Sequence, residues 1–187
     1  MPLSESSPRT AMHHRQVSCR GYLRDDGLWD IEGHLVDVKD YDFETSWRGT
    51  MPAGKPVHDM WLRITVDEDL LIHDCEAAMD HNPYDICPEI VVNFRKLKGL
   101  RIQAGWNRDV SARVGGTQGC THLVELLRPL ATTAFQTLVA SKRHSGRMEQ
   151  ANADRPPRLL NTCHAHADFS PVTEQRWPAF FVGRKRA

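Results

Sequence analysis

The sequence has no excess of charge of either sign. Its 187 residues include 24 lysines and arginines and 24 aspartates and glutamates, so the formal net charge is zero. Proteins that bind nucleic acid through its phosphates usually carry a positive patch, and this composition does not supply one. The basic run Arg184-Lys185-Arg186, at the end of the chain, is too short to change that conclusion. We therefore expect no nucleic-acid partner.

Long hydrophobic runs are also missing. No apolar stretch approaches the roughly 20 residues that span a bilayer, and residues 1–15 lack the apolar segment of a secretory signal peptide. We therefore expect a cytoplasmic protein with no membrane partner. The chain is still 40% hydrophobic, which is enough for a packed core. These features predict a flexible arm over 1–15 and a single domain over 16–187, with an exposed loop at 142–158.

The five cysteines are few and widely spaced. They stand at positions 19, 75, 87, 120 and 163, and no two of them form a C-x-x-C pair. Odd, scattered cysteines do not suit a disulfide framework, and they lack the close spacing of zinc or iron–sulfur ligands. We therefore expect five free thiols.

Residues 16–39 alternate polar and apolar side chains with a period of two, which is typical of a β-hairpin. The turn Asp25-Asp26-Gly27 separates the two arms, and its glycine suits the left-handed position of a three-residue loop. This turn predicts a register in which Arg24 faces Leu28 and Arg20 faces Glu32.

Residues 57–79 predict a second hairpin around the turn Asp67-Glu68-Asp69. His58 begins an alternating row that continues with Met60, Leu62, Ile64 and Val66. A three-residue turn would place Glu76 opposite Met60, on the same face as His58.

Helical periodicity predicts helices at 88–98 and 120–141, with a shorter one in "WNRDVSARVGG" and a kink or break at Pro129. The segment "LLNTCHAHADF" is compatible with a further strand. Because strands come first and helices follow, the predicted fold class is α+β. We expect an antiparallel sheet of two or more hairpins with helices packed on one face.

Cys120 and His122 stand in "RVGGTQGCTHLVELL", where three glycines lead into a helix. They could be a nucleophile and its base, two metal ligands, or ordinary residues of a helix start. A helix N-terminus favours a thiolate, and Gly119 lets backbone amides approach a ligand. Positions two apart in a helix differ by about 200°, so helical geometry alone does not bring Cys120 and His122 together. Glu125, three residues after His122, can contact it.

The face that carries His58 and Glu76 is the second candidate site. Two polar residues in an apolar row cost several kcal/mol unless they are satisfied. Such a row is also where a pocket with an acid/base pair can form. The alternative is a rim position where the strand ends reach water. We predict catalytic roles for His58, Glu76, Cys120 and His122.

The first hairpin supplies a third cluster, Arg20, Glu32 and His34. These side chains could anchor an anionic substrate, with Trp61 as an aromatic wall and Gly119 as a backbone contact. The alternative is a cross-strand ion pair on a solvated face.

The segment Cys163-His164-Ala165-His166 has the most metal-like pattern. In an extended strand His164 and His166 would share one face, as metal ligands can. A third, suitably spaced ligand is missing from the segment. We therefore expect no metal site, but if one exists we expect it at Cys163, His164 and His166.

Five long stretches resemble an uncharacterised bacterial family, domain of unknown function 2889. They are "CRGYLRDDGLWDIEGHLVDVKDY", "PVHDMWLRITVD", "NPYDICPEI", "GLRIQAGW" and "GGTQGCTHLVELLRPLATTAFQTL". The resemblance covers roughly residues 13 to 140, with "TCHA" nearer the end. It implies a bacterial cytoplasmic protein and supplies no reaction and no catalytic residues.

The functional hypothesis therefore rests on the chemistry of the side chains themselves. Titratable side chains that interrupt apolar rows beside tryptophans indicate a small cofactor-independent enzyme. Its substrate would be a small organic acid, carbonyl or aromatic compound, and its chemistry acid/base, of lyase, isomerase or hydrolase type. The alternative is a metal-binding or metallocentre-handling protein that uses Cys and His residues. We expect a small-molecule substrate as partner and no cofactor, while a bound metal ion and a homo-oligomer stay open.

The cysteine pattern yields a first testable prediction. Thiol titration of the denatured protein, purified anaerobically, should find all five cysteines free, because nothing in their spacing supports pairing. Protein reduced before denaturation is the control, since it should give the same number. Three or fewer reactive thiols in the unreduced sample would contradict the prediction.

Overall fold

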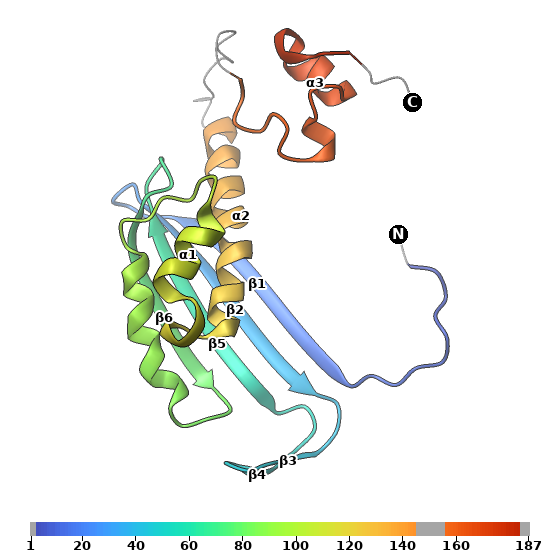
Figure 1. Cartoon of the computed structure of the whole chain (residues 1–187), viewed down its shortest axis with the longest axis vertical. Helices are drawn as coiled ribbons and strands as arrows, with labels where there is room; N and C mark the ends of the chain where they lie inside the picture. The colour runs from blue at the N-terminus through green and yellow to red at the C-terminus, as the bar shows by residue number, and fades with distance from the viewer. Residues whose placement is uncertain (1–2, 145–155, 184–187) are drawn as a thin grey trace. The chain divides into compact units, whose positions relative to one another are not determined.

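The computed structural model describes residues 3–144 and 156–183 (Figure 1). The chain divides into two compact units, Met1–Ser141 and Lys142–Ala187. The sequence had suggested one domain over 16–187. The loop predicted at 142–158 lies largely outside the described residues.

A four-stranded antiparallel sheet forms the centre of the first unit, with strand order β1-β2-β5-β6. The strands are β1 (His13–Leu23), β2 (Trp29–Lys39), β5 (Pro56–Val66) and β6 (Ile72–His81). Residues 40–55 add a separate two-stranded sheet, β3 (Phe43–Thr45) with β4 (Gly49–Met51). The predicted α+β class is confirmed.

The first hairpin has the register that its turn predicted. Arg20 pairs with Glu32, and the Arg24 backbone N–H donates to the Leu28 carbonyl at 2.9 Å. Gly27 has φ +83°, a conformation that glycine adopts without steric cost. The alternation of side chains along β1 and β2 is therefore the predicted one.

The register predicted for the second hairpin is wrong. Residues 67–71 connect the strands instead of a three-residue turn, and a bulge at His73 adds one unpaired residue to β6. A bulge shifts the pairing by one residue, and a shift of one moves every following side chain to the opposite face. Met60 therefore pairs with Met79, while Glu76 pairs with Arg63 on the exposed face.

Three main helices cover one face of the sheet (Figure 1). They are the 3₁₀ helix η1 (Cys87–Leu97), α1 (Trp106–Val114) and α2 (Thr121–His144), with a short turn η2 (Gly116–Gln118) before α2. The helices predicted at 88–98, within "WNRDVSARVGG" and at 120–141 are thus confirmed. Of the two outcomes predicted at Pro129, a kink or a break, the break does not occur, because α2 runs through Pro129 as one helix.

The core lies between the sheet and these helices. It takes alternate residues of β2 and β5 together with the apolar stripe of α2. The largest fully buried side chains include Ile31, Leu35, Met60, Leu62, Ile64, Phe94, Leu123, Leu126, Leu127 and Leu130.

The second unit contains η3 (His164–His166), α3 (Pro171–Arg176) and η4 (Pro178–Phe180). Residues 156–183 form no strand, so the strand suggested for this segment is wrong. Four prolines and short polar runs in residues 156–183 favour turns over a paired strand. The five cysteines of the chain are all unpaired.

The longest helix, α2, is too polar for the interior of a bilayer. None of the helices in the described part of the chain combines the length and the apolar character that a membrane crossing needs.

Helix α2 packs directly on β2 because the strand has a glycine at the contact. A Cβ built on Gly33 would lie 3.0 Å from Leu126 Cγ and 3.1 Å from Leu130 Cδ2. Those distances are shorter than an ordinary van der Waals contact, so a side chain at this position would have to displace Leu126 and Leu130.

We expect Gly33→Val to lower the free energy of unfolding by about 1–3 kcal/mol, since overpacking a dense core costs that much. Urea denaturation followed by circular dichroism measures the change. Ser18→Val adds the same side chain to the exposed face of the neighbouring strand and should change stability far less. Equal losses in the two variants would contradict the packing of α2 on this face.

Candidate functional site: a buried carboxylate beside two imidazoles

Three neighbouring strands place one residue each in a line across the sheet. Arg15 on β1 lies opposite Asp37 on β2, and Asp37 lies opposite His58 on β5. All three face the helices, at the end of the apolar row of β2. Asp37 is only 2% exposed, so a charged carboxylate is buried here. Its neighbours must therefore satisfy it.

Both oxygens of Asp37 are bonded. Arg15 donates from Nε to Oδ1 at 2.7 Å and from Nη2 to Oδ2 at 2.8 Å. His13 Nε2 lies 3.0 Å from Oδ1, and His58 Nδ1 lies 3.0 Å from Oδ2. Burial alone would raise the pKa of the Asp37 carboxyl, but the hydrogen bonds of Arg15 and His13 hold that pKa well below its usual range. Asp37 is therefore a fixed anion.

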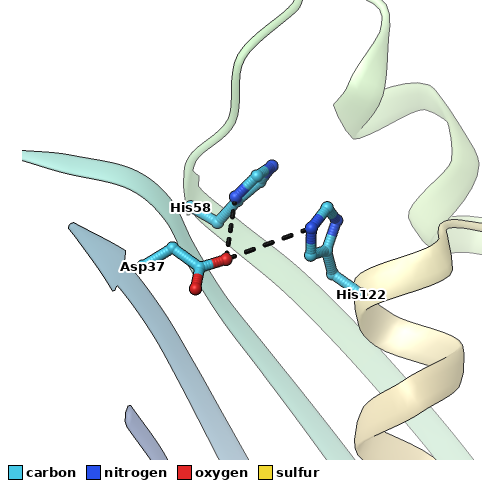
Figure 2. Close-up of side chains that lie close together, drawn as sticks. All are labelled: Asp37, His58 and His122. Atoms are coloured by element: carbon cyan, nitrogen blue, oxygen red, sulfur yellow. Dashed lines mark hydrogen bonds and ion pairs between the residues drawn. The ribbon is translucent and has the colours of Figure 1, made fainter. Parts of the chain in front are cut away.

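Helix α2 brings a second imidazole to the same carboxylate. His122 stands in its first turn, and its Nε2 lies 4.0 Å from Asp37 Oδ2. The rings of His58 and His122 are in contact, with centroids 3.8 Å apart and planes tilted by 33°. Figure 2 shows both rings directed at the same oxygen of Asp37. The structure thus brings together two of the four residues predicted to be catalytic, His58 and His122.

Both imidazoles titrate below their usual range. Burial lowers the pKa of His58, and the neighbouring His122 lowers it further, against the opposing effect of Asp37. Burial lowers the pKa of His122, and the charge of Arg15 adds to that effect. The two rings are therefore neutral at pH 7. A neutral His58 that donates Nδ1–H to Asp37 keeps a free lone pair on Nε2.

Cys120 lies beside His122, contrary to the expectation from helical geometry. Its Sγ is 3.9 Å from His122 Nδ1. The expectation assumed that Cys120 is inside the helix, but α2 begins at Thr121. The carbonyl oxygen of Cys120 accepts the first hydrogen bond of the helix, from the Val124 N–H at 2.9 Å. Outside the helix the angle of 100° per residue does not apply. His122 therefore has the thiol on one side and Asp37 on the other.

Gly119 has a packing role in this entrance. A Cβ at Gly119 would lie 1.9 Å from the carbonyl oxygen of Val114, so only glycine fits. Glu125, which the sequence placed within reach of His122, accepts a hydrogen bond from Arg15 Nη1 at 3.0 Å. Arg15 therefore lies between two carboxylates.

Glu76 does not belong to this cluster. The bulge in β6 places it on the opposite face of the sheet, where it is exposed and paired with Arg63. The predicted pairing of His58 with a carboxylate from β6 is therefore wrong.

The other predicted substrate-binding residues also lie on the opposite face. Glu32 Oε1 lies 3.6 Å from Arg63 Nη1, so its ion-pair partner is Arg63 and not the expected Arg20. His34 stacks flat on Trp61, with ring centroids 3.7 Å apart, and bonds Asp59 at 2.6 Å. This arrangement of partly exposed pairs is the solvated face that the sequence left open.

The Cys163 segment forms a 3₁₀ turn, so His164 and His166 do not share a strand face. Cys163 Sγ lies 3.6 Å from His166 Nδ1, while the rings of His164 and His166 contact Phe169 and Trp177. In the part of the chain that the structure describes, one group of three side chains has metal-binding atoms close together. It consists of Asp37, His58 and His122, with the atoms within 4.8 Å of one another.

A groove of about 330 Å³ lies near the cluster, between α1 and α2. Glu125, the partner of Arg15, lines it, but the two imidazoles do not. The His58 and His122 side chains are 13% and 27% exposed, so both rings are partly open to solvent.

Sequence reasoning missed His13, Arg15 and Asp37, although two signals could have found them. The register of the first hairpin already places Arg15 opposite Asp37. The alternation that buries Ile31 and Leu35 also buries Asp37. A carboxylate in that row requires a cation across the strand.

The family model described as "Protein of unknown function (DUF2889)" matches residues 13–136. The chain belongs to this family. The matched region of this DUF2889 chain contains the whole cluster: His13, Arg15, Asp37, His58, Cys120, His122 and Glu125. No curated protein and no solved structure matches the chain significantly.

The imidazole pair yields a prediction about pH. Because the pKa values of His58 and His122 are lowered in the folded state, the unfolded chain binds more protons near and below pH 6.5. Their contribution to stability is therefore present above pH 6.5 and is lost as the pH falls. We expect the urea concentration at the unfolding midpoint to decrease as the pH is lowered from 7.5 to 5.5. In the double variant His58→Gln/His122→Gln this decrease should be smaller.

His14→Gln is the matched control, because His14 is exposed on the edge strand and should leave the pH dependence unchanged. A double variant with the same slope as the wild type would contradict the assignment of these two rings.

Proposed function

We propose that this chain is a small enzyme that transfers protons on a small organic acid, carbonyl or aromatic compound. Its chemistry is of lyase, isomerase or hydrolase type, and Asp37, His58 and His122 form its active site. The observation that carries the proposal is the buried Asp37 carboxylate, which Arg15 holds in place while it bonds His58 Nδ1 at 3.0 Å.

The proposed base is His58. A carboxylate that accepts Nδ1–H fixes the tautomer and the orientation of the ring, and leaves Nε2 as the proton acceptor. When Nε2 takes a proton from the substrate, Asp37 stabilises the imidazolium that forms. Arg15 keeps Asp37 from taking that proton itself, because it makes the carboxylate weakly basic. These are the properties of a base with an orienting partner.

The proposed second proton carrier is His122, with Cys120 at its other nitrogen. With Nε2–H directed at Asp37, the lone pair of Nδ1 faces the thiol at 3.9 Å. His122 can then accept the thiol proton while the sulfur attacks an electrophilic carbon, or it can protonate a leaving group. Cys120 also directly precedes a helix of 24 residues, and a helix N-terminus can bind a substrate carboxylate or an oxyanion.

The test is proton exchange with solvent. A panel of small oxo acids and aromatic carbonyl compounds is incubated with the protein in D₂O, and proton NMR follows the loss of hydrogen next to each carbonyl. We expect the wild type to catalyse exchange in at least one compound, and His58→Gln to lower that rate by about 100-fold or more, the usual scale for losing an acid/base group.

The variants must also be shown to fold. His58→Gln should melt close to the wild type, and His14→Gln should keep both its melting temperature and its exchange rate. Loss of several kcal/mol of stability in His58→Gln would make His58 a structural partner of Asp37 instead. Exchange rates equal in wild type and His58→Gln would also contradict the proposal.

A further inference from the structure

We propose that Asp37, His58 and His122 also bind a divalent first-row transition-metal ion such as Zn²⁺, and that the bound ion blocks proton transfer. The first half of this inference is independent of the proposed function, and the second half rests on it.

The three ligand atoms already lie close to the spacing that a zinc ion requires. One nitrogen of each imidazole and Oδ2 of Asp37 lie within 4.8 Å of one another, with 3.0 Å to His58 Nδ1 and 4.0 Å to His122 Nε2. A zinc ion about 2.0–2.2 Å from each ligand sets the ligand atoms roughly 3.4 Å apart. His58 Nδ1 is already this close to Oδ2, so the main movement is that of His122 toward the other two ligands, which must close a separation of about 1.4 Å at most. The His122 side chain is 27% exposed in the first helical turn, so part of the ring faces solvent and not the core.

The chemistry of the ligands is suitable. Two imidazoles and one carboxylate are a common ligand set for zinc and other first-row ions, and three protein ligands leave a position open for water. Asp37 is held from its other side by Arg15 and His13, as the carboxylates of metal sites are held by outer partners. Arg15 opposes a second cation, but Glu125 lies against Arg15 and offsets its charge.

The ion and the base exclude each other because of the imidazole tautomers. A neutral imidazole has one lone pair on nitrogen. An ion at Nδ1 of His58 moves the ring proton to Nε2, the atom that accepts a proton from the substrate. An ion at Nε2 of His122 likewise moves the proton to Nδ1, which faces Cys120. Each ring keeps one proton, so the charge balances, but neither ring can act as a base.

The experiment is a calorimetric titration with ZnCl₂. Full-length protein without an affinity tag is stripped with EDTA, dialysed and titrated at pH 7.5. We expect one zinc ion per chain at this site. His58→Gln and His122→Gln should each weaken the Kd by at least about 10-fold, the lower end of the effect of losing even an outer partner. His14→Gln should leave the Kd unchanged.

Thermal melts of the same variants exclude loss of folding as the cause. The double variant Cys163→Ser/His166→Gln tests the other metal-like segment of the chain. Zinc affinity lost in that variant and retained in His122→Gln would overturn the site. No heat of binding in the wild type would overturn it as well.

The proton-exchange assay separates this inference from the proposed function. One equivalent of ZnCl₂ should reduce exchange by the wild type by about 10-fold or more. This estimate follows from the loss of the base. Exchange unaffected by bound zinc would overturn the exclusion. Tight zinc binding in a chain that never catalyses exchange would support the metal site and count against the proposed function.

Discussion

The burial of one carboxylate, Asp37, constrains the rest of this structure. A charged group that is 2% exposed would cost several kcal/mol without partners, and the sheet supplies those partners from both neighbouring strands. Arg15 and His13 come from β1 and His58 from β5. The strand order β1-β2-β5 therefore places the partners of Asp37 on both sides of it. An order without β1 and β5 beside β2 would leave the buried charge without these partners.

Much of the fold follows from local patterns. The glycine of the first turn and the alternation around it predict the pairing of Arg20 with Glu32, and the apolar stripe of α2 predicts which side chains are buried. The second hairpin could not be predicted in the same way, because its turn has no glycine and its bulge at His73 has no composition signal. One additional residue in β6 was enough to move Glu76 to the wrong face.

The site was only partly visible in the sequence for a related reason. His58 stands out because it is a polar residue in an apolar row, and His122 because it opens a helix. Asp37 has the same kind of position in β2, but its importance depends on β5 lying beside β2, a long-range pairing that periodicity does not reveal. The contact between Cys120 and His122 depends on a smaller detail. Cys120 lies one residue before the first residue of α2, and sequence patterns do not locate a helix boundary to a single residue.

The edge position of β1 has a consequence for the dynamics of the site. Ten of its eleven residues are exposed, and among the described strands it pairs with β2 alone, with a further ion pair from Arg15 to Glu125 of α2. Edge strands of this kind detach locally at a smaller free-energy cost than the centre of a sheet. If β1 separates, Asp37 loses Arg15 and His13 together while it keeps His58. The carboxylate would then become a stronger base and compete with the imidazole for the same proton. Fraying of one strand would thus act as a switch on the acidity of the whole cluster, with no movement of the helices.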